Sequence, residues 1–185
     1  MPEADAKTLA AMAHPLRRRL LRQLSVNGPA TASQLAERTD QLVGNVSHHL
    51  KVLAECGLIE LAPELAKDKR ERWWRSVRMT LSWSMPDAEA DPAEYAVATA
   101  AESVNLDQHI SWVRDWIAAR DTYAKEWSEA SAATDGWSTA TPEELADLTS
   151  ELIGVITRFC GRDVPDDGRH REPVFVFAHA APGRL

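Results

Sequence analysis

Residues 31–59 read TASQLAERTDQLVGNVSHHLKVLAECGLI, and this stretch decides the fold. Thr31 followed by Gln34 is a capping-box pattern, which predicts a short helix that runs to about Arg38. The next residues form the predicted turn, in which Asp40 can adopt an unusual backbone angle or cap the following helix. The pattern up to this point is the first half of a helix-turn-helix.

A longer helix follows the turn and is expected to run to Cys56, where Gly57 can end it as a left-handed cap. Its inward residues recur at helical spacing, namely Val46, Leu50 and Leu53. The opposite face is small, polar and basic, with Gly44, His48 and Lys51 flanked by Asn45 and Ser47, while His49 lies nearer the core boundary.

The chemistry of this outward face suits a DNA groove. Asn can pair with an adenine edge, Ser and His can donate to bases or phosphates, and Lys neutralises phosphate. Gly44 permits close approach of the backbone. We therefore expect this helix to contact double-stranded DNA.

The flanking segments complete a winged-helix pattern. Upstream, residues 5–13 and 15–26 are expected to form two amphipathic helices. Downstream, residues 58–62 and 71–79 read as two strands of a hairpin, joined by the polar and basic segment 64–70. Three helices and a hairpin around a longer helix are the order of a winged helix-turn-helix, in which the hairpin reaches alongside the groove.

Charge divides the chain into a basic part and an acidic part. The net charge is -7 at pH 7, but residues 1–80 carry +4 and residues 81–185 carry -11. A basic half is consistent with a nucleic-acid partner, whereas uneven surface solvation is the alternative. Four arginines of the second helix are expected mostly toward solvent, namely Arg17, Arg18, Arg19 and Arg22.

The second half is expected to begin after a linker over residues 81–91. Asp91-Pro92-Ala93-Glu94 combines an N-cap, a first-turn proline and a capping glutamate, and opens a helical run to Tyr123 and beyond. Residues 104–107 could break this run into two helices. Thr141-Pro142-Glu143-Glu144 is a further capping box, and Gly161 ends the helix that follows it.

A small sheet is also expected in this half. Residues 128–134 and 137–140 flank Asp135-Gly136, a two-residue hairpin turn signal, and residues 173–180 form an apolar strand. The predicted fold class is therefore mainly α with a small β content. A winged helix-turn-helix domain over residues 5–80 precedes an α+β dimerisation or sensing domain over residues 92–185.

A family resemblance rests on four segments: Ala13-His14-Pro15-Leu16-Arg17, Gln34-Leu35-Ala36-Glu37, Val46-Ser47-His48-His49-Leu50-Lys51-Val52-Leu53 and Cys56-Gly57-Leu58-Ile59. Over roughly residues 7–79 the chain resembles the ArsR-type (arsenical-resistance repressor-like) regulators. The resemblance implies a dimeric, sequence-specific repressor whose DNA affinity changes with a bound signal. It implicates Asn45, Ser47, His48, His49 and Lys51 in groove contacts, and Lys67, Lys69, Arg70 and Arg72 in the wing.

The sequence departs from that family in two places. The Cys-x-Cys pair of the metal sensors falls on Thr31 and Ser33, which are poor ligands for soft metals, so a non-metal-sensing member is expected. The turn position that is commonly glycine is Asp40, and the usual small N-cap falls on Leu42. The start of the recognition helix is therefore expected to differ slightly.

Three tryptophans in the acidic half leave two interpretations open. Trp112 and Trp116 lie one helical turn apart, and Trp127 follows. Such residues are typical of a core or a dimer interface, and the alternative is an aromatic pocket for a small organic effector. A third hypothesis, from another class, is a winged-helix protein-interaction module without DNA binding.

Other functional classes find little support in the sequence. Nucleophile-elbow, phosphate-loop and His-Glu-x-x-His motifs are missing, so we expect no enzyme activity, cofactor or metal site. Cys56 and Cys160 are far apart and predict neither a disulfide framework nor a zinc site. No apolar stretch is long enough to cross a bilayer, so we expect a cytoplasmic protein without a membrane partner. The family resemblance adds the expectation of a homodimer.

Overall fold

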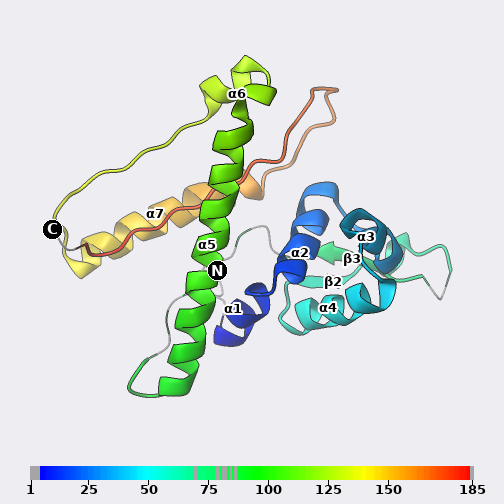
Figure 1. Ribbon diagram of the computed structural model, residues 1–185, viewed down its shortest axis with the longest axis horizontal. Helices are drawn as coiled ribbons and strands as arrows, with labels where there is room; N and C mark the ends of the chain where they lie inside the picture. Colours follow the sequence, from blue (N-terminus) through cyan, green and yellow to red (C-terminus); the bar gives the residue numbers. More distant parts are fainter. Residues whose placement is uncertain are drawn as a thin grey trace. The chain divides into compact units, whose positions relative to one another are not determined.

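The computed structural model describes residues 5–68, 71–77, 80, 83, 85 and 87–183. The chain divides into two compact units, Met1–Asn105 and Leu106–Leu185. Figure 1 labels the α-helices of both units and, in the first unit, strands β2 and β3. The first unit contains the predicted DNA-binding elements.

Four helices form in the first part of the chain where the sequence predicts them. They are α1 (Ala6–Met12), α2 (Pro15–Asn27), α3 (Ala32–Thr39) and α4 (Val43–Glu55). The α3 capping box is complete, because the Gln34 N–H donates to Thr31 Oγ1 and the Thr31 N–H donates to Gln34 Oε1. These reciprocal bonds satisfy two backbone donors that the first turn of a helix leaves free.

The turn between α3 and α4 depends on Asp40, whose φ of 53° is left-handed. The backbone N–H of Asp40 turns back to the carbonyls of Ala36 and Glu37, which stops α3. Leu42 is the N-cap of α4 and makes no side-chain cap bond. Beyond α4, Gly57 has a φ of 63°, as expected of a left-handed cap.

A three-stranded antiparallel sheet lies beside these helices. Its strands are β1 (Ala30–Thr31), β2 (Ile59–Leu61) and β3 (Trp73–Ser76), in the order β1-β3-β2, and the 3-10 helix η1 (Pro63–Leu65) follows β2. Trp74 lies on the central strand β3, where it pairs with Ala30 of β1 on one side and with Leu61 of β2 on the other. The hairpin is as predicted but shorter, and β1 was not predicted because two residues carry no period-2 pattern.

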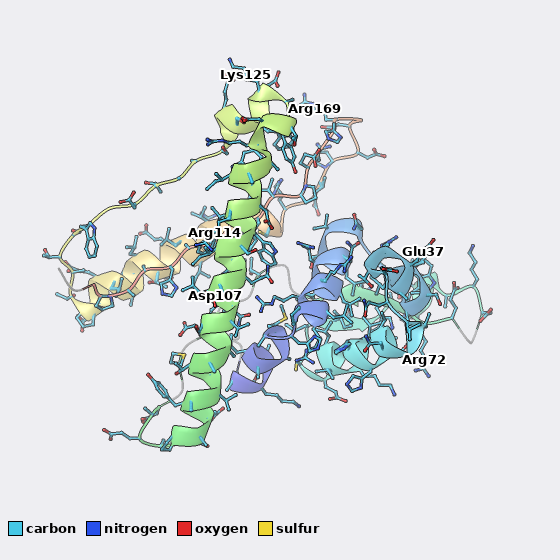
Figure 2. The ribbon with its side chains drawn as sticks, in the orientation of Figure 1. Glu37, Arg72, Asp107, Arg114, Lys125 and Arg169 are labelled. Atoms are coloured by element: carbon cyan, nitrogen blue, oxygen red, sulfur yellow. The ribbon has the colours of Figure 1, made fainter. Side chains whose placement is uncertain are left out.

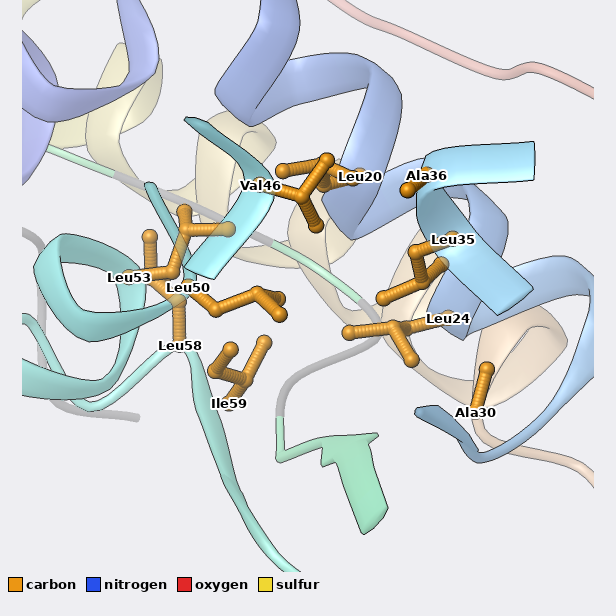
Figure 3. Packing of buried hydrophobic residues seen from close by; sticks show 10 residues of the cluster. All are labelled: Leu20, Leu24, Ala30, Leu35, Ala36, Val46, Leu50, Leu53, Leu58 and Ile59. Carbon is orange, nitrogen blue, oxygen red and sulfur yellow. The ribbon is translucent and has the colours of Figure 1, made fainter. Parts of the chain in front are cut away.

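The core of the helix-turn-helix is a single aliphatic cluster. It brings together α2, α3, α4 and the first sheet strands through ten buried side chains (Figure 3), namely Leu20, Leu24, Ala30, Leu35, Ala36, Val46, Leu50, Leu53, Leu58 and Ile59. The predicted inward residues of α4 are all fully buried. Burial of this stripe fixes the rotation of α4 about its axis, and therefore the face that α4 presents outward.

A second, smaller core joins α1 to the long helix α5 (Pro92–Ala119). Its buried members are Ala6, Leu9, Ala98 and Ala101, and Trp83 and Met85 pack against it. The indole N–H of Trp83 donates to Glu102 Oε1 at 3.1 Å. The division between the two units thus falls inside α5, and two residues of the segment expected to be a linker pack on the first unit.

The second unit contains the rest of α5, the 3-10 helix η2 (Arg120–Thr122), α6 (Lys125–Ala130) and α7 (Pro142–Cys160). Helix α5 continues through residues 104–107 without the break that the sequence allowed. The α7 capping box is complete, with bonds in both directions between Thr141 and Glu144. The expected class, mainly α with a small sheet after an N-terminal helix-turn-helix, is confirmed.

The small sheet expected in the second half is not present, since residues 106–183 contain no strand. Residues 128–130 belong to α6, and an ion pair between Lys125 and Glu129 at 2.6 Å supports this helix. Residues 131–140 and 171–183 are in neither helices nor strands. A turn signal such as Asp135-Gly136 acts locally, whereas a strand also needs a neighbour for its backbone hydrogen bonds. Among the described residues, no helix has the length and hydropathy of a membrane span.

Candidate nucleic-acid interface

Most of the residues of α4 that were predicted from the sequence to contact DNA lie on its outward face. Gly44, Asn45, His48 and Lys51 are exposed, and Ser47 is partly buried at the edge of the same face. The other face of the helix is locked into the aliphatic core. A rigid helix with donors, an acceptor and a cation on its free face has the chemistry to contact base edges and phosphates.

Asn45 is held by a chain of amide hydrogen bonds that starts in the turn. Its Nδ2 donates to Gln41 Oε1 at 3.1 Å, and Gln41 Nε2 donates to the Asp40 carbonyl at 2.8 Å. Gln41 was not predicted from the sequence, although its i, i+4 spacing to Asn45 indicates that the two side chains can meet. Because Asn45 is exposed, its carbonyl oxygen and its second N–H can serve as one acceptor and one donor for a ligand.

His49 differs from its neighbours because it is only 7% exposed. Its ring centroid lies 4.4 Å from that of His14 and 5.3 Å from that of His48. Burial is the largest cause that lowers the pKa of His49, and the charges of His14 and Arg17 lower it further. The structure therefore places His49 in the contact between α4 and the start of α2, away from the exposed face.

Two of the four basic residues that were predicted for the wing lie among the residues that the structure describes. Lys67 and Arg72 are exposed, whereas Lys69 and Arg70 lie outside the residues that the structure describes. The loop between them is shaped by its acidic residues, because Glu71 Oε2 accepts the Lys67 N–H and Asp68 Oδ1 accepts the Glu71 N–H. Both bonds use the backbone of Lys67 and Glu71, so they leave the ammonium group of Lys67 available to a phosphate.

A further arginine of the hairpin has a different role. Arg75 on β3 pairs with Glu60 at 2.7 Å and with Glu64 at 2.6 Å. Hydrogen bonds to these carboxylates raise the pKa of the Arg75 guanidinium. Arg75 thus joins β3 to β2 and to η1, and the two carboxylates already compensate its charge.

The arginines of α2 do not all face solvent, which corrects the sequence-based expectation. Arg19 and Arg22 are exposed, but Arg18 is only 6% exposed, and its Nε and Nη1 have no hydrogen-bond partner among the described residues. Arg17 is partly buried and donates to the carbonyls of Ala10 and Ala11 in α1. The bend between α1 and α2 covers these two side chains, and helical periodicity within α2 could not reveal it.

Two of the three predicted effector residues, Trp112 and Trp116, lie in separate aromatic groups of the second unit. Trp112 packs edge-on against Phe175 at 4.5 Å, and the ring of His109 lies 5.2 Å from both Phe175 and Phe177. Trp116 instead contacts Tyr123 at 5.2 Å. Trp127 is partly buried. The two phenylalanines were assigned to a strand by the sequence and were missed as members of this cluster.

Comparison with known proteins agrees with the geometry of the first unit. A family model described as a helix-turn-helix domain matches residues 12–62, which is the segment from the end of α1 to the end of β2. No curated protein matches the chain. The chain therefore contains a helix-turn-helix domain, and this supports a DNA-binding regulator of transcription.

Proposed function

We propose that the protein is a sequence-specific transcriptional repressor of the ArsR type that does not sense metals and that binds an inverted repeat as a homodimer. The observation that carries the proposal is the outward face of α4, where Asn45, His48 and Lys51 are exposed while the opposite face is fully buried. One such helix can enter the major groove of each half-site.

The amide chain in the turn supports base recognition by Asn45. With one N–H engaged by Gln41, Asn45 keeps one donor and one acceptor. This pair matches the N7 acceptor and the N6 donor of adenine in the major groove. We therefore assign base recognition to Asn45. His48 and Lys51 are assigned hydrogen bonds to the groove edge or to the phosphate backbone.

The wing adds backbone contacts beside the groove. Lys67 and Arg72 are exposed cations on either side of the loop tip. Phosphate contacts of this kind fix the position of a protein on the duplex without reading its sequence. The net charge of +4 over residues 1–80 favours the same encounter with a polyanion.

A homodimer is favoured by the composition of the second unit's surface. Every side chain of residues 106–183 is at least partly exposed, including a set of large apolar residues on α7. Exposed apolar residues that gather on one helix favour an interaction site, because contiguous apolar surface is uncommon on soluble monomers. A second copy of the chain is the partner that also supplies the second recognition helix.

The test is a selection from random duplexes with the purified full-length protein, followed by affinity measurements at two salt concentrations. We expect one inverted repeat to be enriched. His48→Ala and Lys51→Ala should each weaken binding to it, because each removes a donor or a cation from the face.

Lys125→Ala is the matched control for Lys51→Ala. Lys125 lies at the start of α6 (Figure 2), pairs with Glu129, and lies outside the proposed interface. Its loss should leave the affinity unchanged. Equal weak binding of all duplexes, or equal effects of the two lysine substitutions, would contradict the proposal and favour the protein-interaction module.

The aromatic group around Trp112 favours a second candidate, a regulator that a small organic ligand releases from DNA. His109 and Phe175 contact Trp112 within the second unit, and Phe177 contacts His109 and Phe175. Stacked and edge-on rings can bind a flat apolar compound. Equilibrium dialysis against a broad metabolite set tests this candidate, and a set without a binder counts against it.

A further inference from the structure

The contact between His14 and His49 links the recognition helix to a residue outside it. His14 is the N-cap of α2, and its Nδ1 accepts the backbone N–H of Leu16 at 3.2 Å. An Nδ1 atom that accepts a hydrogen bond carries no proton, so this cap needs the neutral imidazole. The ring of His14 lies against His49, whose centroid is 4.4 Å away at an interplanar angle of 40°.

His49 is also held in its neutral form by its surroundings. Its side chain is buried, and its Nδ1 has no hydrogen-bond partner among the described residues. A buried imidazolium would need acceptors for both of its N–H groups. Protonation would therefore leave a buried donor unpaired, which is costly.

The charged and titratable groups around the pair all oppose a positive charge or are neutral. Arg17 from α2 and His48 from α4 each lower the pKa of both His14 and His49 by charge repulsion. Cys56, at the end of α4, raises the pKa of Arg17. From α1, only the backbone carbonyls that accept from Arg17 reach this region among the contacts described. Two imidazolium rings at this separation, beside a guanidinium group, would repel one another.

We propose that His14 is a positioning residue for the recognition helix: its neutral ring holds His49 against the start of α2, and protonation of either ring releases this hold and weakens DNA binding. The inference rests on the proposed function, because it concerns the placement of the DNA-contacting face. His49 lies in α4 between exposed His48 and exposed Lys51 of that face, so a shift of the helix at His49 also moves these two residues.

The direction of the pH effect follows from burial. Desolvation lowers the pKa of both His14 and His49 below the ordinary value of 6.5. The unfolded or released rings then bind protons more readily than the packed rings do. The packed arrangement is fully favoured above about pH 6.5 and is progressively lost as the pH falls below that value.

The experiment measures affinity for the selected duplex at constant ionic strength between about pH 8 and about pH 5.5. Every protein compared carries His48→Gln, which removes the third imidazole, whose ring centroid lies 5.3 Å from that of His49. His14→Asn is added to one of them, because Asn keeps an acceptor for the Leu16 N–H but does not titrate. His49→Gln is the second variant, and circular dichroism at each pH verifies that the proteins are folded.

We expect the affinity of the His48→Gln protein to fall on acidification, by at most about tenfold per ring between about pH 6.5 and about pH 5.5, since each pH unit below the ordinary pKa changes the protonation equilibrium by a factor of ten. Addition of His14→Asn or His49→Gln should flatten this profile. His170→Gln is the matched control, because His170 is an exposed histidine of the second unit that contacts Glu172. Its profile should keep the steep slope.

Three results would overturn the inference. The first is an affinity that does not fall in acid, and the second is an equally steep fall in the His14→Asn and His49→Gln proteins. Either leaves the proposed function intact, because the duplex is still bound at about pH 8. Absence of specific binding by the wild-type protein at every pH is the third, and it would contradict the proposed function together with the inference.

Discussion

At the scale of single residues, the backbone of Asp40 decides how sharply the chain turns from α3 into α4. Its φ of 53° lies in the region where a Cβ atom crowds the following carbonyl. Asp tolerates this region better than most residues, which explains how the turn forms without glycine. The turn in this chain therefore contains some backbone strain that the surrounding core maintains.

Substitution of Asp40 should reveal that strain. We expect Asp40→Val to lower the free energy of unfolding by about 1–2 kcal/mol, because a β-branched residue is strongly disfavoured at positive φ. Asp40→Gly should not lower it. Urea unfolding measures both, and Ser33→Ala at an exposed position of α3 is the control, with an expected change within about 0.5 kcal/mol. Equal losses in the Val and Gly proteins would show that the side chain, not the backbone angle, matters.

At the scale of elements, α4 and the β2–β3 hairpin expose two kinds of side chain for the proposed contacts with DNA. The register of the hairpin, with Leu61 opposite Trp74, places exposed Arg72 immediately before β3. Figure 2 labels Arg72 on this hairpin. Asn45 on α4 is suited to a base, whereas Arg72 is suited to a phosphate.

The two elements should respond differently to salt and to sequence. We expect Arg72→Ala to weaken binding to all duplexes alike and to reduce the slope of log affinity against log salt by about 1. Arg75→Ala removes the same charge from the same hairpin, but Glu60 and Glu64 already engage Arg75, so its slope should change less. Identical salt slopes for the Arg72→Ala and Arg75→Ala proteins would contradict a phosphate contact by Arg72.

Asn45→Ala should instead reduce discrimination. We expect it to cost about 1–3 kcal/mol of preference for the selected base pair over its replacement, with the salt slope unchanged. Competition between the selected duplex and duplexes with single base-pair changes measures this preference. An unchanged preference at every position, with weaker binding overall, would mean that Asn45 contacts the backbone.

At the scale of the whole molecule, the two units differ in how well they are packed. The first has two clusters of buried side chains, whereas residues 106–183 have none that is fully buried. On α7, Leu148 and Val155 are 49% and 55% exposed. A unit that leaves such surface uncovered gains stability by association, because burial of apolar surface is the main favourable term.

We expect sedimentation to report a dimer at micromolar concentration. Val155→Glu should shift it toward the monomer, because a carboxylate in an apolar interface loses hydration without gaining a partner. Ser150→Glu adds the same charge to an exposed position on another side of α7 and should leave the dimer intact. A wild-type monomer, or dissociation by both substitutions, would contradict an interface on the apolar stripe of α7.

The sequence by itself determined where the capped helices of both units begin and end. Capping boxes at Thr31 and Thr141, the stop at Gly57 and the inward stripe of α4 all follow from bonds and spacings within a few residues. Local hydrogen bonds and a 3.6-residue period need no knowledge of distant partners. The outward residues of α4 were therefore identified together with the inward ones.

Only the tertiary structure decided which residues meet across the chain. The burial of Arg18, the contact of His14 with His49, and the packing of Phe175 on Trp112 each join segments that are separated in sequence. The absence of a sheet within residues 106–183 belongs with them, because strands depend on a partner strand. Local patterns record what one segment can form, whereas burial and pairing depend on what the other segments bring to it.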